Sequence, residues 1–179
     1  MQIYSLSHRR HPMSSALKIS LYSLALTTVL SLQTANANEA LSIQEQGKAL
    51  IQAFSSDLKM ELKKAIKEGG LKNGIAVCSE KAPVIAVKHS DNQWQLKRTS
   101  LKVRNPANRA TAFEQDALVH FQIKKDQGIP ISDLNLYQAE KTENGKTHRI
   151  MKAIPTQALC LGCHGDNIAE DVKSELQLR

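Results

Sequence analysis

The chain has 179 residues, which is the size of one ordinary domain with some additional sequence, and its formal net charge is +7 at pH 7. Only 4% of the residues are aromatic, and no run of Lys and Arg has aromatic side chains interleaved, so the composition does not support nucleic-acid binding. The three cysteines are an odd number, and a single disulfide would leave one thiol over in an oxidising compartment.

The first 37 residues have the pattern of an export signal. A basic segment is followed by an apolar run at 19–32, and Ala35-Asn36-Ala37 matches an A-x-A cleavage site. We predict cleavage after Ala37, which divides the chain into a signal peptide (1–37) and one domain (38–179). The apolar run is shorter than the roughly 20 residues that cross a membrane. We therefore expect a periplasmic or otherwise exported protein with no stable membrane span after cleavage; an uncleaved helical anchor is the alternative.

The domain is predicted to begin with a long amphipathic helix at 42–68. Apolar side chains recur there every three or four positions, and Lys and Glu fill the other face. Ser42 and Glu45 have the spacing of a capping box at the start of this helix, and Gly69-Gly70 is a helix-ending signal.

Smaller elements follow in the middle of the chain. The pattern predicts a short helix at 84–89, a strand at 93–100, a polar loop at 101–110 and a second amphipathic helix at 111–125.

A hairpin is predicted next, from strands at 134–140 and 146–154 joined across Asn144-Gly145. Both central residues of a type I′ turn need positive φ, which Asn and Gly tolerate. Counting outward from that turn pairs Glu140 with Arg149. A short helix with two cysteines and a polar tail complete the chain, and the order of elements predicts a small α+β domain with an antiparallel sheet.

The segment Cys160-Leu161-Gly162-Cys163-His164 is a C-x-x-C-H motif. On one helical turn, its two thiols reach both vinyl groups of a haem, and the next imidazole lies over the iron. We predict one covalent haem c, with Cys160 and Cys163 as thioethers and His164 as an axial ligand. A zinc site formed by Cys78, Cys160, Cys163 and His164 is the alternative, although adjacent residues rarely both point at one metal ion.

A second axial ligand must come from upstream, because few residues follow His164. Candidate side chains are Cys78, Met60, Met151, His89, His120 and His148. Cys78 stands out because iron would protect a free thiol outside the cell; an ordinary buried cysteine is the alternative. His120 is expected in the core, whereas His89 and His148 are expected to be solvated.

Three segments together resemble a known family: Val77-Cys78-Ser79-Glu80-Lys81-Ala82-Pro83, the stretch from Arg98 to Asn108 (RTSLKVRNPAN), and the C-x-x-C-H motif. The family comprises single-haem c-type proteins with a PAS-like fold, the cyanobacterial Tll-like haem domain, long filed as a domain of unknown function. Its iron is held by Cys and His, which the resemblance maps onto Cys78 and His164. It also implies a PAS-like antiparallel sheet with flanking helices, a long N-terminal amphipathic helix and a C-terminal helix carrying the motif.

Arg98, Lys102 and Arg104 lie in the second of these segments and are candidate contacts for the haem propionates. An Arg fork matches a carboxylate; a solvated basic loop is the alternative.

The function we expect is low-potential electron transfer, because a thiolate ligand favours ferric iron. The alternative is a haem-based redox or gas sensor, and either role requires a partner protein, a redox partner or an output protein. A cytochrome c′ four-helix bundle is a third possibility, which the predicted hairpin opposes. We expect no enzyme, since no acid–base pair or nucleophile lies beside the motif.

Overall fold

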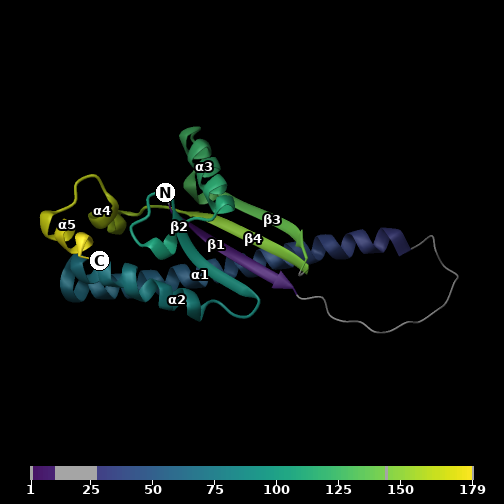
Figure 1. The fold of residues 1–179 in the computed structure, drawn as a ribbon, viewed down its shortest axis with the longest axis horizontal. Coiled ribbons are helices and arrows are strands. Elements are labelled where there is room, and N and C mark those ends of the chain that lie inside the picture. The colour runs from purple at the N-terminus through teal and green to yellow at the C-terminus, as the bar shows by residue number, and fades with distance from the viewer. Residues whose placement is uncertain (1, 11–27, 144, 179) are drawn as a thin grey trace.

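The computed structural model describes residues 2–10, 28–143 and 145–178, with only the backbone of 28–41 and of residues 2, 4, 9 and 10. Its centre is an antiparallel sheet of four strands in the order β2-β1-β4-β3 (Figure 1). The strands are β1 (Gln2–Arg10), β2 (Trp94–Ser100), β3 (Asn135–Thr142) and β4 (Gly145–Ile154). Mixed helices and an antiparallel sheet confirm the predicted α+β class.

Three helices cover the two faces of this sheet: α1 (Thr28–Ala76), α2 (Ala82–Lys88) and α3 (Ala112–Asp126). Two short helices, α4 (Ala158–His164) and α5 (Glu170–Gln177), pack against α1 beyond the end of the sheet (Figure 1). A π-helical turn, η1 (Val77–Lys81), joins α1 to α2, and two 3₁₀ turns lie at η2 (Pro106–Asn108) and η3 (Ile131–Asp133). The polar tail was not predicted to contain α5, because this helix has only two apolar residues, Val172 and Leu176, among polar ones.

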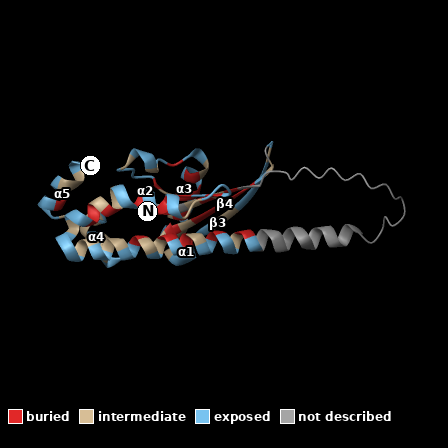
Figure 2. Ribbon diagram, turned by 90° about the horizontal axis from the view of Figure 1, so that it is seen from below, coloured by how far each residue is buried: buried red, intermediate tan, exposed pale blue. Residues whose placement is uncertain are grey.

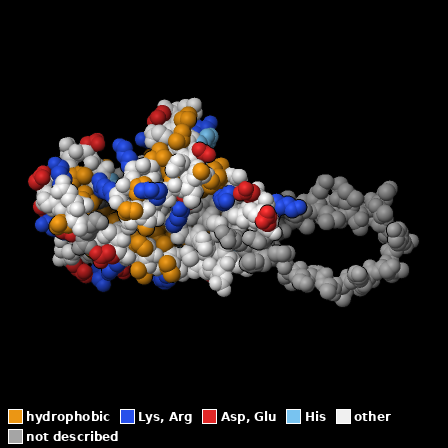
Figure 3. Space-filling model, in the orientation of Figure 1, with side chains coloured by type: hydrophobic (Ala, Val, Ile, Leu, Met, Phe, Trp, Pro, Cys, Tyr) orange, Lys and Arg blue, Asp and Glu red, His pale blue; other side chains and the backbone are white. Residues whose placement is uncertain are grey.

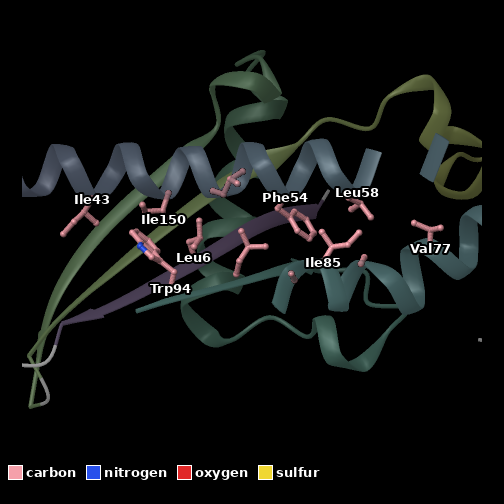
Figure 4. Close-up of a cluster of buried hydrophobic side chains, with 12 residues drawn as sticks. Leu6, Ile43, Phe54, Leu58, Val77, Ile85, Trp94 and Ile150 are labelled. Carbon is pink, nitrogen blue, oxygen red and sulfur yellow. The ribbon is translucent and has the colours of Figure 1, made fainter. Parts of the chain in front are cut away.

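Two clusters of buried side chains explain why the helices lie where they do. On one face, Leu6, Trp94 and Ile150 of the sheet pack against Phe54 and Leu58 of α1 (Figure 4). Figure 2 shows the buried positions of α1 gathered on the side that meets the sheet. On the other face a second cluster packs against α3; it contains Ile3, Ala110, Ala117, Leu118, Phe121, Leu134, Met151 and Ala153. Each strand thus carries apolar side chains to a helical layer.

The first helix is longer than predicted. It begins at Thr28, so Ser42 lies inside it, and the Ser42 hydroxyl accepts a hydrogen bond from Gln46 Nε2 (3.3 Å). The predicted capping box is therefore wrong, because the helix already has an upstream turn at that point. The helical geometry does break at Gly69 and Gly70, where Gly70 has φ +70°, and the chain then returns to helical geometry as far as Ala76.

The predicted signal peptide includes β1. Gln2–Arg10 pairs with β2 on one side and with β4 on the other, and both Ile3 and Leu6 are fully buried. Most of the apolar run at 19–32 lies outside the described residues. Cleavage after Ala37 stays a prediction, and it would remove the strand between β2 and β4. Within the described residues, no helix has the length and apolar character to cross a membrane.

The hairpin of β3 and β4 forms, but its register differs from the prediction. Thr142 pairs with Gly145, and Glu140 therefore pairs with Thr147 rather than with Arg149. Gly145 belongs to the strand instead of the centre of the turn, which shifts the pairing by two residues. Arg149 still reaches Glu140 diagonally as an ion pair, so the charge complementarity survives at a different spacing.

The second amphipathic helix begins as its sequence indicates. Thr111 Oγ1 accepts from the Glu114 amide, and Glu114 returns the contact by accepting from the Thr111 amide, so a capping box is present at the start of α3. Glu114 also forms an ion pair with Lys97 of β2 (2.8 Å). This buried carboxylate therefore ties α3 to the sheet.

Candidate haem site

The C-x-x-C-H motif forms the short helix α4, which has no buried residue. Cys160 and Cys163 are half-buried and His164 is its last residue. The Gly165 amide closes the helix by donating to the Leu161 carbonyl (2.8 Å). Gly162 faces α1 so closely that a Cβ there would lie 2.7 Å from Cδ1 of Leu71. The glycine therefore lets the motif approach α1.

Cys78 lies in the π-helical turn η1, half-buried, at the junction of α1 and α2. The Ala82 amide donates to the Val77 carbonyl, which gives the turn its wide loop. Ser79 Oγ donates to the Ile75 carbonyl (2.9 Å) and ties the turn back to α1. Single π-helical turns are rare and recur at functional sites. The backbone conformation therefore indicates a functional site at Cys78, in addition to the reactivity of its thiol.

A cavity of about 700 Å³ lies between these two segments. All seven residues predicted for the site line it: Cys78, Arg98, Lys102, Arg104, Cys160, Cys163 and His164. Its apolar wall comes mainly from α1, through Ile51, Leu58, Leu62, Ile66 and Ile75. Cofactor pockets span roughly 300–1,000 Å³ and combine apolar walls with a few polar groups. The donor set and the size fit a covalently attached haem.

The other candidate axial ligands, all of them described residues, do not line this cavity. Met60 is 62% exposed, and Met151 is buried in the cluster beneath α3. His89 Nε2 lies 2.9 Å from an Asp57 carboxylate oxygen. Of the six candidates for the second axial ligand, only Cys78 therefore lines the cavity.

Three expectations about histidines are wrong. The His89 side chain, expected to be solvated, is only 15% exposed. His120 is exposed on α3 rather than placed in the core. His148, expected to be solvated, is 1% exposed, and its Nδ1 lies 2.7 Å from the Tyr137 hydroxyl. The sequence around His148 is polar, but β4 is covered on both faces, and burial follows from that position in the sheet.

The electrostatics of the site favour neutral ligand groups before a metal is bound. Burial raises the pKa of Cys78, and the nearby charge of Arg98 opposes that rise. The pKa of Cys163 is raised by burial and then by its proximity to Cys78. Desolvation lowers the pKa of His164, and Arg104 and Arg98 lower it further. A neutral imidazole has a lone pair ready for a metal, whereas each thiol must lose its proton on binding.

Two of the predicted propionate contacts reach backbone carbonyls. Arg98 Nη2 donates to the Cys78 carbonyl (2.8 Å), and Arg104 Nη1 donates to the Cys163 carbonyl (2.8 Å). Lys102 is exposed at the cavity. Propionate binding stays a prediction for all three residues, and the contact between Arg98 and Cys78 was missed. Basic side chains elsewhere are scattered among apolar and acidic ones on the face in Figure 3.

The zinc alternative finds no support in this geometry. Within the part of the chain that the structure describes, no three His, Cys, Asp or Glu side chains converge as ligands of one metal ion. Cys78, Cys160, Cys163 and His164 share a cavity without forming a tetrahedral set. Haem iron needs only two axial donors from the protein, so the same arrangement is compatible with haem.

One protein-family model, described as Tll0287-like: Tll0287, matches residues 29–177. The match includes η1, β2 and α4, with every residue of the candidate site, and it begins after β1. No curated protein and no solved structure matches the chain.

Proposed function

The chain belongs to the Tll0287-like family, and with this and the site geometry as premises we propose that it is an exported electron-transfer protein with one covalent haem c. The observation that carries the proposal is the shared cavity of about 700 Å³, which joins Cys78 of η1 to Cys160, Cys163 and His164 of α4. Two thiols for the vinyl groups and two axial donors are the full set of protein ligands that a six-coordinate haem c requires.

Each residue has a separate task in this proposal. Cys160 and Cys163 would hold the porphyrin through thioether bonds, and His164 and Cys78 would ligate the iron, Cys78 as a thiolate. When bound, the haem supplies an iron that accepts and releases one electron. The apolar wall of α1, including Leu58 and Leu62, keeps water away from the porphyrin face.

The thiolate sets the direction of the reduction potential. Its negative charge stabilises ferric iron relative to ferrous iron, so the potential is low. With both axial positions held by the protein, no position on the iron is free for a substrate. This supports a carrier that passes electrons to a partner protein and catalyses no reaction itself.

A low-spin absorption spectrum tests the proposal. The protein is made in a host that attaches haem to exported chains, and Cys78→Ala is compared with Ser79→Ala in the same turn. We expect a thiolate-ligated ferric spectrum in the wild type and in Ser79→Ala, and its loss in Cys78→Ala with the haem still attached. An unchanged spectrum in Cys78→Ala would exclude Cys78 as a ligand.

A sensor is the second candidate function, because in the proposed site Cys78 would be linked to the haem only by its sulfur–iron bond. Release of that bond on reduction would open the iron to a small gas, and a separate output protein would then read the change. Carbon monoxide separates the two roles: rapid binding to the reduced wild type favours a sensor, and inertness favours a carrier.

A further inference from the structure

The Cys78 carbonyl lies at a point where its own helix supplies no hydrogen-bond donor. In η1 the Ala82 amide donates to the Val77 carbonyl. The next amide in that series would be Pro83, and proline has no N–H. The carbonyl of Cys78 therefore needs a donor from elsewhere in the fold.

Arg98 supplies that donor from β2. Its Nη2 lies 2.8 Å from the Cys78 carbonyl oxygen, and the residue is half-buried. This hydrogen bond joins β2 to the backbone of the turn that carries Cys78.

Helix α4, which carries the other proposed haem ligands, has a similar contact but depends on it less. Arg104 Nη1 donates to the Cys163 carbonyl at the same distance of 2.8 Å. With a haem attached, however, α4 is tied to the porphyrin by two thioether bonds as well as by His164. Cys78 has no covalent bond to the porphyrin. A contact that fixes its backbone therefore matters more than the matching contact on α4.

We propose that Arg98 is a positioning residue that holds Cys78 against the iron, so that loss of its hydrogen bond exposes the reduced iron to small gases. The inference rests on the proposed function, because it requires a haem with Cys78 as a ligand. It assigns to Arg98 a task other than binding a propionate.

The test measures carbon monoxide binding to the reduced, haem-loaded protein. The variants are Arg98→Gln and Arg98→Lys, with Arg149→Gln of β4 and Lys88→Gln of α2 as controls, because neither residue lines the cavity. A charge-assisted hydrogen bond is lost in Arg98→Gln, and we expect the apparent affinity for carbon monoxide to rise at least about tenfold. Arg98→Lys keeps the charge but not the planar fork, so a smaller rise is expected. Both controls should stay within about twofold of the wild type.

The outcomes separate this inference from the proposed function. Haem content, circular dichroism and the oxidised spectrum of each protein are recorded first. A wild type without a Cys- and His-ligated haem contradicts the proposed function. A correctly ligated wild type whose affinity is unchanged in both Arg98 variants overturns only the role of Arg98. An equal rise in Arg149→Gln also overturns it, because the effect would then be a general loosening of the fold.

Discussion

Strand β1 and helix α4 are held in the protein in different ways. β1 lies inside the sheet, pairs with a strand on each side and buries Ile3 and Leu6 completely. α4 has no buried residue; it meets α1 through Gly162 and receives one hydrogen bond from Arg104. The comparison teaches that the sheet is stabilised by the polypeptide alone, whereas the cysteine-bearing helix would gain its firmest attachment from the proposed haem. The two regions should therefore fail independently when mutated.

The largest effect is expected from removing both thioether anchors. Cys160→Ala with Cys163→Ala should abolish covalent haem attachment completely, because no other thiol has the required spacing. The sheet should persist, since neither cysteine belongs to a buried cluster. Mass spectrometry checks attachment, and circular dichroism checks the fold. Haem that stays covalently bound in this variant would exclude the motif as its anchor.

Leu6→Ala should have the next largest effect, now on stability. The Leu6 side chain is completely buried, in the cluster that also contains Trp94 and Ile150. Truncating a buried leucine costs about 2–5 kcal/mol in the free energy of unfolding. Urea denaturation of the chain that retains residues 1–37 measures it. A loss below about 0.5 kcal/mol would show that β1 contributes little to the folded sheet.

The Leu6→Ala prediction applies only to the uncleaved chain, because cleavage after Ala37 would remove Leu6 with the rest of β1. The sequence of residues 1–37 fits a signal peptide, while in the structure Gln2–Arg10 pairs with a strand on each side. Pairing of that kind depends on partners far along the chain, and local pattern does not reveal it. The same reason explains the register of the hairpin and the burial of His148.

The candidate site was more accessible to prediction than the sheet. A C-x-x-C-H motif has a fixed local spacing, so Cys160, Cys163 and His164 could be singled out from the sequence, and the structure places all three on one cavity. The apolar wall follows from the periodicity of α1. The contact of Arg98 with Cys78 required the fold, although Pro83 gave a local sign that a nearby carbonyl would lack its helical donor.

Glu114→Gln should have an intermediate effect that depends on pH. Burial alone would raise the pKa of Glu114, but hydrogen bonds from Lys97, Ser5 and the Thr111 amide outweigh it and lower the pKa. The folded protein therefore favours the carboxylate, and its contribution is present above the unfolded pKa of about 4.3 and lost as the pH falls through the lower folded value.

We expect Glu114→Gln to lower the free energy of unfolding by about 1–2 kcal/mol at pH 7. The difference from the wild type should shrink as the pH falls below about 4. Urea titrations at several pH values measure it. A difference that is constant over this range would contradict the role of the charged form in joining α3 to β1 and β2.

Leu161→Ala should have the smallest effect and is the matched control for Leu6→Ala. Leu161 lies between the two cysteines of α4 and is 50% exposed. Substitution of an exposed residue changes stability by about 0.5 kcal/mol or less. The same urea titration compares the two leucines. A loss as large as that of Leu6→Ala would show that α4 is fixed by the polypeptide after all, and the contrast between the regions would be lost.

The most direct test of the central claim is the intact mass of the exported protein, purified from a host that attaches haem c and denatured to release any cofactor that is not covalently bound. We predict a coloured chain that carries the mass of one haem, linked through Cys160 and Cys163. A colourless chain with the mass of the polypeptide alone, obtained where a known c-type cytochrome matures normally, would contradict the account.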